Sequence, residues 1–474
     1  MTGGWPFTRR ELVAGLLVFL LTLPFVTARI YASDEVQYFA WLRSWTFDRD
    51  VDFENEYQHF HDAGVARDTP FHETFLVRRN EAGRRENYGP VGSAILWAPF
   101  YAVGHVAARL TGQPADGYSQ PYVSAVAYAS AIYGGLALLL SAAIARQLVG
   151  YGLTASLIVC FGTPLVFYIY VAPPMSHANS AFAVALFLWV WLRVRRAWRP
   201  GGVALLGVIG ALMTMVRDQD AFFVAGPAID FVRHWWKTSP TRGPVAADAT
   251  RSTLLAAATT GVVAFVVAYA PQLLASAALH GHFGPSDVVS RKMSWTSPHM
   301  LEVLFSPAHG FLAWTPLALV AIAGLVLLAA GRVRPAVPNG TQSAAWIATL
   351  ALVMVALQAY VSGAVESWTV QGSFGQRRFV GLTPVLTLGI AVVLRLAATA
   401  WQRAGRAALA LALVLCVWWN LGLMVQFGTH TMDRQRLTLR ENAWTTFVVL
   451  PREAPTLVWR YLTDRASFYK RPRQ

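Results

Sequence analysis

The stretch LVAGLLVFLLTLPFVTA at residues 12–28, followed closely by Ser33-Asp34-Glu35, decides the class of this protein. The apolar run approaches the length that a helix needs to cross a bilayer. Two adjacent carboxylates follow just where the chain leaves the lipid. Acidic groups at such a place are costly because they lose hydration on one side, so they are usually retained for proton or ion chemistry. Asp34 and Glu35 are therefore the first candidates for a catalytic base.

The composition supports a membrane protein. Of the 474 residues, 55% are hydrophobic and 14% are charged, which does not suit a soluble globular chain. The net charge of +14 indicates basic cytoplasmic loops and contact with anionic lipids or phosphorylated substrates. No motif for nucleic-acid binding appears. The sequence predicts an all-α, polytopic membrane protein.

Apolar runs predict about 11 membrane-spanning helices. They lie near residues 11–28, 122–145, 152–171, 178–194, 202–216, 221–233, 253–278, 310–330, 344–362, 379–396 and 407–425. Residues 1–425 then form one transmembrane domain. Within it, residues 29–121 make a large first extracytoplasmic loop with juxtamembrane helices, and residues 426–474 form a short extracytoplasmic tail.

The position of residues 91–109 decides the topology, because counting them as a span would reverse the side of every later loop. If they form a juxtamembrane helix instead, the short basic loops all share the side of the N-terminus. This is the distribution expected of cytoplasmic loops. The basic positions are Arg146, Arg193, Arg195, Arg196, Arg199, Arg233, Lys237, Arg242, Arg332, Arg334, Arg395, Arg403 and Arg406. We therefore expect a cytoplasmic N-terminus.

The same topology places the chemically unusual segments together on the outer face. They are the first loop and the segments at residues 173–177, 217–220, 280–309 and 373–378. The cytoplasmic loops, in contrast, are short and basic, and no nucleotide-binding loop occurs in the sequence. Energy for a reaction must then come from an activated substrate or an ion gradient. The sequence predicts one outward-facing site.

Basic residues and a histidine in these segments are candidate ligands for phosphate. Arg377 and Arg378 precede a predicted helix, where a guanidinium can bind a phosphate with two hydrogen bonds; alternatively, they extend to anionic lipid. His177 follows Pro173-Pro174 and either contacts the substrate or is a structural histidine. Arg217 and Asp220 bracket a short turn that lines a cavity, unless Arg217 simply pairs with a neighbouring aspartate.

Other polar and aromatic groups have open interpretations. An acidic stretch offers oxygen and imidazole ligands for a divalent cation, but its spacing specifies no metal, and a solvated acidic loop is the alternative. Its members are Asp48, Asp50, Asp52, Glu54, Glu56, His59 and His61. We therefore predict no cofactor. Trp295 and Trp368 are either interfacial anchors or platforms on which a sugar stacks. Asp34 and Glu35 themselves could instead be solvated or bridged to Arg29 or Arg43.

The layout resembles the GT-C superfamily of polytopic glycosyltransferases, in particular bacterial relatives of protein O-mannosyltransferases and aminoarabinose transferases. One helix, an acidic pair, a large outer loop and about ten further spans follow in that order. Three stretches look like those of bacterial members: SDEVQY at residues 33–38, YGPVGS at residues 88–93 and FGQRRF at residues 374–379. The separate soluble C-terminal domain of the family is not evident here.

This resemblance implies an inverting transfer of a sugar from a polyprenyl-phosphate carrier to a hydroxyl group on a lipid-linked glycan, an envelope polysaccharide or a protein, at the outer face of a bacterial inner membrane. Asp34 matches the general base, and Glu35 orients it or shares its role. The implied phosphate ligands are Arg377, Arg378 and Arg217, and the implied substrate contacts are His177, Asp220, Tyr88 and Gln376.

Two other classes of function remain open. A secondary transporter or a flippase of a lipid-linked sugar also uses outward cavities and membrane carboxylates, but it should show internal pseudo-symmetry and ionisable residues deep in several spans. A scaffold that binds a glycan lipid without chemistry is the other alternative. The predicted helices contain almost no acidic residues in their interiors, and the charged residues cluster at one face. This distribution favours an enzyme at the membrane surface over a transport pathway through the membrane.

Overall fold

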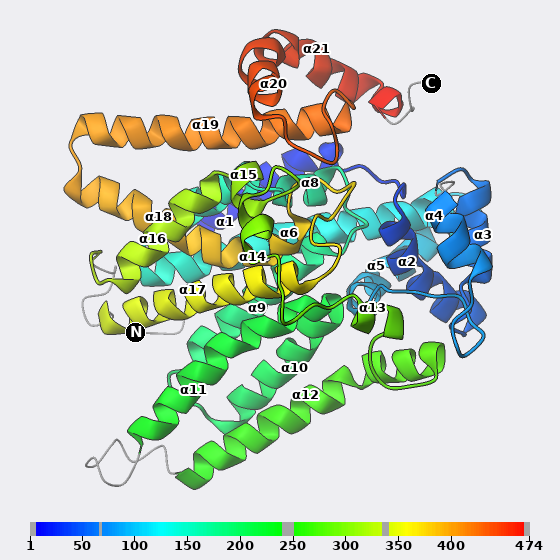
Figure 1. Ribbon diagram of the computed structural model, residues 1–474, viewed down its shortest axis with the longest axis horizontal. Helices are drawn as coiled ribbons and strands as arrows, with labels where there is room; N and C mark the ends of the chain where they lie inside the picture. The colour runs from blue at the N-terminus through cyan, green and yellow to red at the C-terminus, as the bar shows by residue number, and fades with distance from the viewer. Residues whose placement is uncertain (1–5, 66–68, 239–250, 334–340, 469–474) are drawn as a thin grey trace.

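The computed structural model describes residues 6–65, 69–238, 251–333 and 341–468, and these residues form an all-α fold (Figure 1). The only β-type pairing within them is one isolated bridge between Met293 and Val365. Six helices are long and apolar enough to cross a membrane: α6 (Gln120–Leu148), α9 (His177–Val194), α12 (Arg251–His280), α17 (Thr341–Ala364), α18 (Thr383–Ala400) with the turn before it, and α19 (Arg403–Gly428). These helices indicate a multi-pass membrane protein.

The remaining predicted spans form shorter or broken helices. Helices α1 (Arg9–Thr22) and α10 (Pro200–Val216) are continuous. The segment at 152–171 is divided into α7 (Gly152–Gly162) and α8 (Leu165–Tyr170), and the segment at 310–330 into α15 (Phe311–Trp314) and α16 (Leu317–Ala329). Pro164 and Pro316 lie at the two breaks, where proline lacks the N–H that an uninterrupted helix requires. The segment at 221–233 is a 3-10 helix (Asp218–Val224) followed by α11 (Ala225–Lys237).

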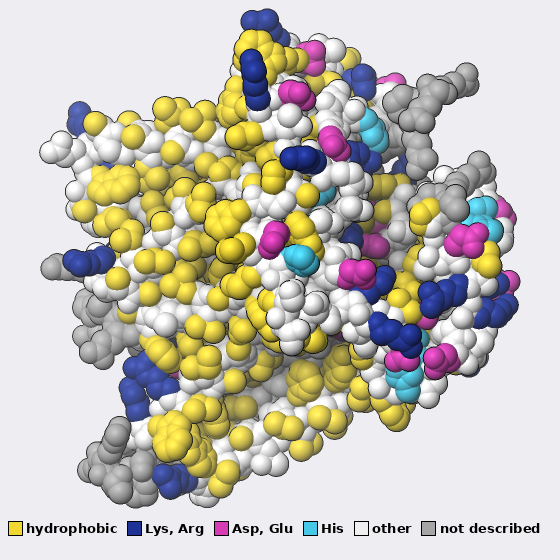
Figure 2. All heavy atoms as spheres, in the orientation of Figure 1, with side chains coloured by type: hydrophobic (Ala, Val, Ile, Leu, Met, Phe, Trp, Pro, Cys, Tyr) yellow, Lys and Arg dark blue, Asp and Glu magenta, His cyan; other side chains and the backbone are white. Residues whose placement is uncertain are grey.

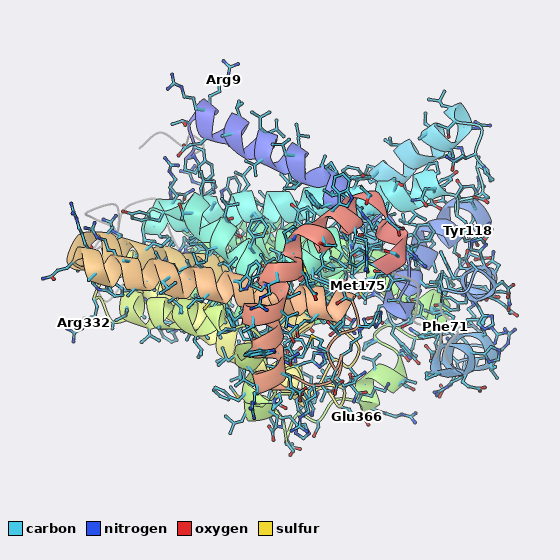
Figure 3. The ribbon with its side chains drawn as sticks, turned by 90° about the horizontal axis from the view of Figure 1, so that it is seen from above. Arg9, Phe71, Tyr118, Met175, Arg332 and Glu366 are labelled. Carbon is cyan, nitrogen blue, oxygen red and sulfur yellow. The ribbon has the colours of Figure 1, made fainter. Side chains whose placement is uncertain are left out.

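Basic loops gather at one end of the helix bundle. Figure 3 shows Arg9 and Arg332 toward this end, and Figure 2 shows Lys and Arg side chains beyond a broad hydrophobic surface. An ion pair ties the end of α9 to the middle of α11 here: Nε of Arg195 and Oδ2 of Asp230 are 2.6 Å apart. The bundle therefore has one basic end, and a polar region at the other end.

The first loop forms this polar region, labelled by Phe71 and Tyr118 in Figure 3. It contains α2 (Ser33–Arg43), α3 (Glu54–Asp62), α4 (Thr69–Phe71) and α5 (Gly92–Leu110), with π-helical turns at Ser44–Asp48 and His72–Val77. Buried aromatic residues such as Trp41 and Trp97 form a core that the first loop shares with neighbouring residues of α6, α10 and α12. Residues 91–109 lie almost entirely in α5, which packs against α6.

The remaining short helices connect the spans or end the chain. They include α13 (Asp287–Arg291), α14 (Met300–Phe305), α20 (Leu439–Trp444) and α21 (Leu450–Thr463), with 3-10 turns at Leu23–Phe25, Arg377–Leu382 and Arg465–Phe468 and a π-helical turn at Thr445–Val449. Trp418 of α19 donates to the carbonyl oxygen of Thr446 over 2.8 Å, and Tyr461 donates to that of Phe25 over 3.0 Å. The predicted C-terminal tail thus contains helices that fold back onto α19 and the 3-10 turn that follows α1.

Glycines allow some of these helices to approach closely. A Cβ atom on Gly324 of α16 would collide with the carbonyl oxygen of Gly389 in α18, and one on Gly389 would collide with that of Ala321. Small residues at helix contacts are the usual means by which membrane helices pack tightly. The contact places α18, and the turn before it, against the rest of the bundle.

Replacing Gly324 with alanine should therefore lower the free energy of unfolding by about 1–3 kcal/mol, because α16 and α18 must separate to admit the methyl group. Gly15→Ala is the matched control, since a Cβ at Gly15 meets nothing within 4 Å. Thermal unfolding of both variants in the same detergent checks this. Equal melting temperatures for Gly324→Ala and the wild type would contradict the packing described.

Candidate functional site

An ion pair joins the polar region to the start of α18. The Oδ2 atom of Asp34 lies 2.6 Å from Nη1 of Arg377, and the two side chains are 35% and 22% exposed. Asp34 is in the first turn of α2, and Arg377 begins the 3-10 turn before α18. Gly375, with φ of 59°, makes the bend before Arg377, and a Cβ there would press on Pro164. The pair brings together two candidate residues that lie far apart in the sequence.

Glu35, in contrast, turns back into the protein. Its Oε2 atom accepts hydrogen bonds from the backbone N–H groups of Tyr31 (2.7 Å) and Ala32 (3.1 Å), and the side chain is fully buried. A glutamate at this position satisfies N–H groups at the start of a helix. Burial raises the pKa of Glu35 to about 8, although the two backbone donors oppose the shift. The adjacent carboxylates therefore differ: Glu35 holds the start of α2, and Asp34 faces the site.

Arg217, at the end of α10, lies in a frame of hydrogen bonds. Its Nη1 atom donates to Ser176 Oγ (3.2 Å) and to His177 Nδ1 (2.9 Å). Because a guanidinium only donates, Nδ1 of His177 must accept, and the ring is neutral. The centre of the His177 ring lies 4.3 Å from that of Tyr168. His177 thus orients Arg217.

Arg378 is held at the edge of the same region. Its guanidinium donates to the backbone oxygen (3.0 Å) and the hydroxyl oxygen (3.1 Å) of Ser367. Its own carbonyl oxygen accepts from the side-chain amides of Gln219 (2.7 Å) and Gln358 (3.0 Å). These bonds tie the turn after α10 to the turn before α18.

Arg217 and Arg378 therefore lie within electrostatic range of the ion pair between Asp34 and Arg377. Arg378 interacts electrostatically with Arg377, Arg217 and Asp34. The buried Nε atom of Arg217 has no hydrogen-bond partner in the described part of the chain. Clustered guanidinium groups repel one another, and an anion bound between them would relieve that repulsion.

Sequence reasoning assigned no role to two residues beside this cluster, although both lie in segments that it singled out. Tyr38 forms a side-chain hydrogen bond with Ser176, and burial raises the pKa of its hydroxyl while Arg217 opposes the shift. Its spacing of four residues from Asp34 on a helix is the signal that could have revealed it. Met175, in the interior of the molecule in Figure 3, has its sulfur 3.9 Å from Nη1 of Arg377. The segment at residues 173–177 was expected on the outer face, but nothing in the sequence pointed to the side chain of Met175.

The other predicted substrate contacts have separate places. Asp220 accepts a hydrogen bond from Ser180 Oγ over 2.6 Å and is buried in the described structure. Gln376 donates to the carbonyl oxygens of Trp368 (2.9 Å) and His309 (3.2 Å), so it supports the loop before Arg377.

Tyr88 belongs to the first loop. Its ring lies 5.7 Å from that of Phe75, measured between centroids, and its N–H donates to Gln37 Oε1 over 2.9 Å. The side-chain amide of the neighbouring Asn87 donates a hydrogen bond to the backbone carbonyl oxygen of Gln37. Tyr88 is thus held against α2 by contacts that involve neither Asp34 nor Arg377.

Arginines engage the acidic stretch of the first loop. Arg43 forms ion pairs with Asp48 and with Glu56, the latter at 3.2 Å. Glu54 pairs with both Arg79 and Arg85 at 2.9 Å. In residues 6–65, 69–238, 251–333 and 341–468, no group of three or more His, Cys, Asp or Glu side chains is placed to hold a metal ion. These carboxylates brace the first loop.

Comparison with protein-family models and with curated proteins gave no match for this chain. A solvent-accessible carboxylate next to several guanidinium groups can accept a proton and stabilise an anion at one place.

Glu35→Gln should reduce the pH dependence of stability. Because the pKa of Glu35 is raised to about 8 in the folded protein and is about 4.3 in an unfolded chain, the wild type should lose stability as pH rises through this interval. Glutamine keeps an oxygen for the two backbone donors but does not ionise. Thermal unfolding at pH 5 to 9 should show a smaller fall for the variant. Parallel curves would mean that Glu35 is already ionised in the folded protein.

Proposed function

We propose that this protein transfers a sugar, with inversion, from a polyprenyl-phosphate carrier to a hydroxyl acceptor at the outer face of a bacterial inner membrane. The observation that carries the proposal is the 2.6 Å contact between Asp34 and Arg377, with Arg217 and Arg378 in electrostatic range. A base and cations for a leaving phosphate are the two things that such a reaction requires.

Asp34 takes the role of the general base. The acceptor oxygen attacks the anomeric carbon while the bond from that carbon to the phosphate oxygen breaks. The hydroxyl proton passes to the Asp34 carboxylate, and the electron pair of the broken bond stays on the phosphate. Arg377 stabilises the resulting negative charge, and Arg378 and Arg217 add to its field.

The ion pair also suggests how donor binding prepares the base. Before the donor arrives, Arg377 occupies the carboxylate of Asp34. A phosphate competes for the same guanidinium, because Arg binds phosphate oxygens with two parallel hydrogen bonds. Arg377 then turns to the donor, and Asp34 becomes available for the acceptor hydroxyl. His177 and Ser176 keep Arg217 oriented throughout.

The membrane body suits a lipid-linked donor. We propose about 11 spans in a GT-C arrangement, in which the six long helices are joined by five shorter segments: α1, α7 with α8, α10, α11 with its preceding turn, and α15 with α16. The prenyl tail would lie against their apolar surface. The phosphate would then reach Arg377 at the outer end of α18.

Asp34→Asn should lower donor turnover by about 10²–10⁴-fold, because the amide cannot take the acceptor proton. The assay uses purified protein in liposomes with radiolabelled polyprenyl-phosphate sugars and cell-envelope extract as acceptor. Asp433→Asn, at an exposed aspartate, is the matched control and should keep full turnover. Normal turnover by Asp34→Asn would exclude Asp34 as the base. If folded wild type turns over no donor, a transporter becomes the better assignment.

Arg377→Gln should weaken donor binding by about tenfold or more, since a charge-assisted hydrogen bond to phosphate is lost. Binding of a polyprenyl-phosphate sugar is measured directly, without acceptor. Arg332→Gln, at the opposite end of the bundle (Figure 3), should bind the donor as the wild type does. Equal affinities for Arg377→Gln and the wild type would remove Arg377 from the phosphate site.

A further inference from the structure

An open groove of about 560 Å³ lies outside the ion-pair cluster, lined by residues 291–296 and Glu366. Its lining combines the cations Arg291 and Lys292, the indole of Trp295 and the carboxylate of Glu366. Figure 3 shows Glu366 at the margin of the molecule. None of these side chains has a part in the transfer step proposed above.

Backbone contacts hold the two walls of the groove together. Met293 and Val365 form the isolated antiparallel bridge. The N–H of Glu366 donates to the carbonyl oxygen of Lys292 over 2.8 Å, and that of Ser294 donates to Ala364 over 2.6 Å. The groove is therefore formed before any ligand arrives, which lowers the entropic cost of binding.

Trp295 presents a braced aromatic surface. Its side chain is 44% exposed, and its ring centre lies 6.2 Å from that of Tyr360 and 6.3 Å from that of Phe222. The Tyr360 hydroxyl also donates to the carbonyl oxygen of Trp295 over 2.5 Å. A flat ring fixed in this way can pack against the C–H face of a sugar.

The polar groups of the groove suit the rest of a saccharide. Glu366 can accept hydrogen bonds from hydroxyl groups, and Lys292 is an exposed cation. Arg291 is also exposed, and its contact with Asp287 is long, at 3.9 Å. Two cations next to an aromatic ring favour a saccharide with anionic groups over a neutral one.

The groove adjoins the candidate site along both walls. Phe222, which contacts the Trp295 ring, belongs to the same 3-10 helix as Asp220. On the other wall, Glu366 precedes Ser367, which accepts two hydrogen bonds from Arg378. The groove is therefore connected to Arg378 through Ser367, and to the turn that follows Arg217 through Phe222.

We propose that this groove binds the acceptor, and that the acceptor is a saccharide chain bearing carboxylate or phosphate groups. Trp295 stacks on one sugar ring, Glu366 accepts from its hydroxyl groups, and Arg291 and Lys292 pair with the anionic groups. The role as acceptor rests on the proposed glycosyltransferase function, whereas binding of the saccharide does not.

The test is calorimetric titration of the protein in lipid nanodiscs, without donor, with trigalacturonate and with the neutral maltotriose. We expect wild type to bind trigalacturonate about tenfold more tightly than maltotriose, because only the former pairs with the two cations. Trp295→Ala should lower the affinity for both trisaccharides about tenfold, as expected when an aromatic contact is lost. Trp459→Ala, at a 69% exposed tryptophan of α21, is the matched control and should leave both affinities unchanged.

The double variant Arg291→Gln, Lys292→Gln, which removes both positive charges, should weaken the binding of trigalacturonate and leave that of maltotriose unchanged. The affinity of this variant for trigalacturonate should also depend less on salt concentration than that of the wild type. Trp295→Phe keeps an aromatic ring and should retain most of the affinity for both trisaccharides. This variant therefore distinguishes loss of the aromatic contact from misfolding of the alanine variant. Failure of wild type to bind either trisaccharide at millimolar concentration, or full affinity in Trp295→Ala, would overturn the proposal.

Saccharide binding in the groove and sugar transfer at Asp34 can be tested independently of each other. Asp34→Asn should bind trigalacturonate as the wild type does, because Asp34 does not line the groove. Trisaccharide binding by wild type without turnover of any donor would support the groove and oppose the transferase assignment. Donor turnover without trisaccharide binding would support the transferase and overturn the groove.

Discussion

The ion pair between Asp34 and Arg377 is the interaction on which the site depends. It joins the first turn of α2 to the turn before α18, so it links the polar region to the helix bundle. Both side chains are partly exposed. Opening a partly exposed pair costs far less than breaking a buried one, because water solvates the separated charges. In the function proposed here, an arriving phosphate replaces the carboxylate as the partner of Arg377.

The adjacent acids Asp34 and Glu35 differ because their surroundings differ. Asp34 faces a guanidinium, whereas Glu35 is buried and has its pKa raised to about 8. Glu35 also satisfies two backbone N–H groups, so it determines where α2 begins and hence where Asp34 lies. One carboxylate supports the fold, and the other is available for chemistry.

Polar contacts between turns keep the cationic groups in position. His177 and Ser176 orient Arg217, and the amides of Gln219 and Gln358 hold the backbone of Arg378. A charged group that is fixed in advance needs little reorganisation when a ligand binds. The groove beside Trp295 is built similarly, since paired backbone segments form both its walls.

The sequence by itself determined the all-α membrane class, because long apolar runs with few charges are a local property of the chain. It also marked Asp34, Arg377 and Arg217, since charges at helix ends are visible without a structure. Tertiary structure alone decided that Asp34 meets Arg377, that Glu35 turns inward and that Tyr38 joins the cluster. Those facts depend on how distant segments pack and on which side of each helix is buried, and no local pattern encodes either.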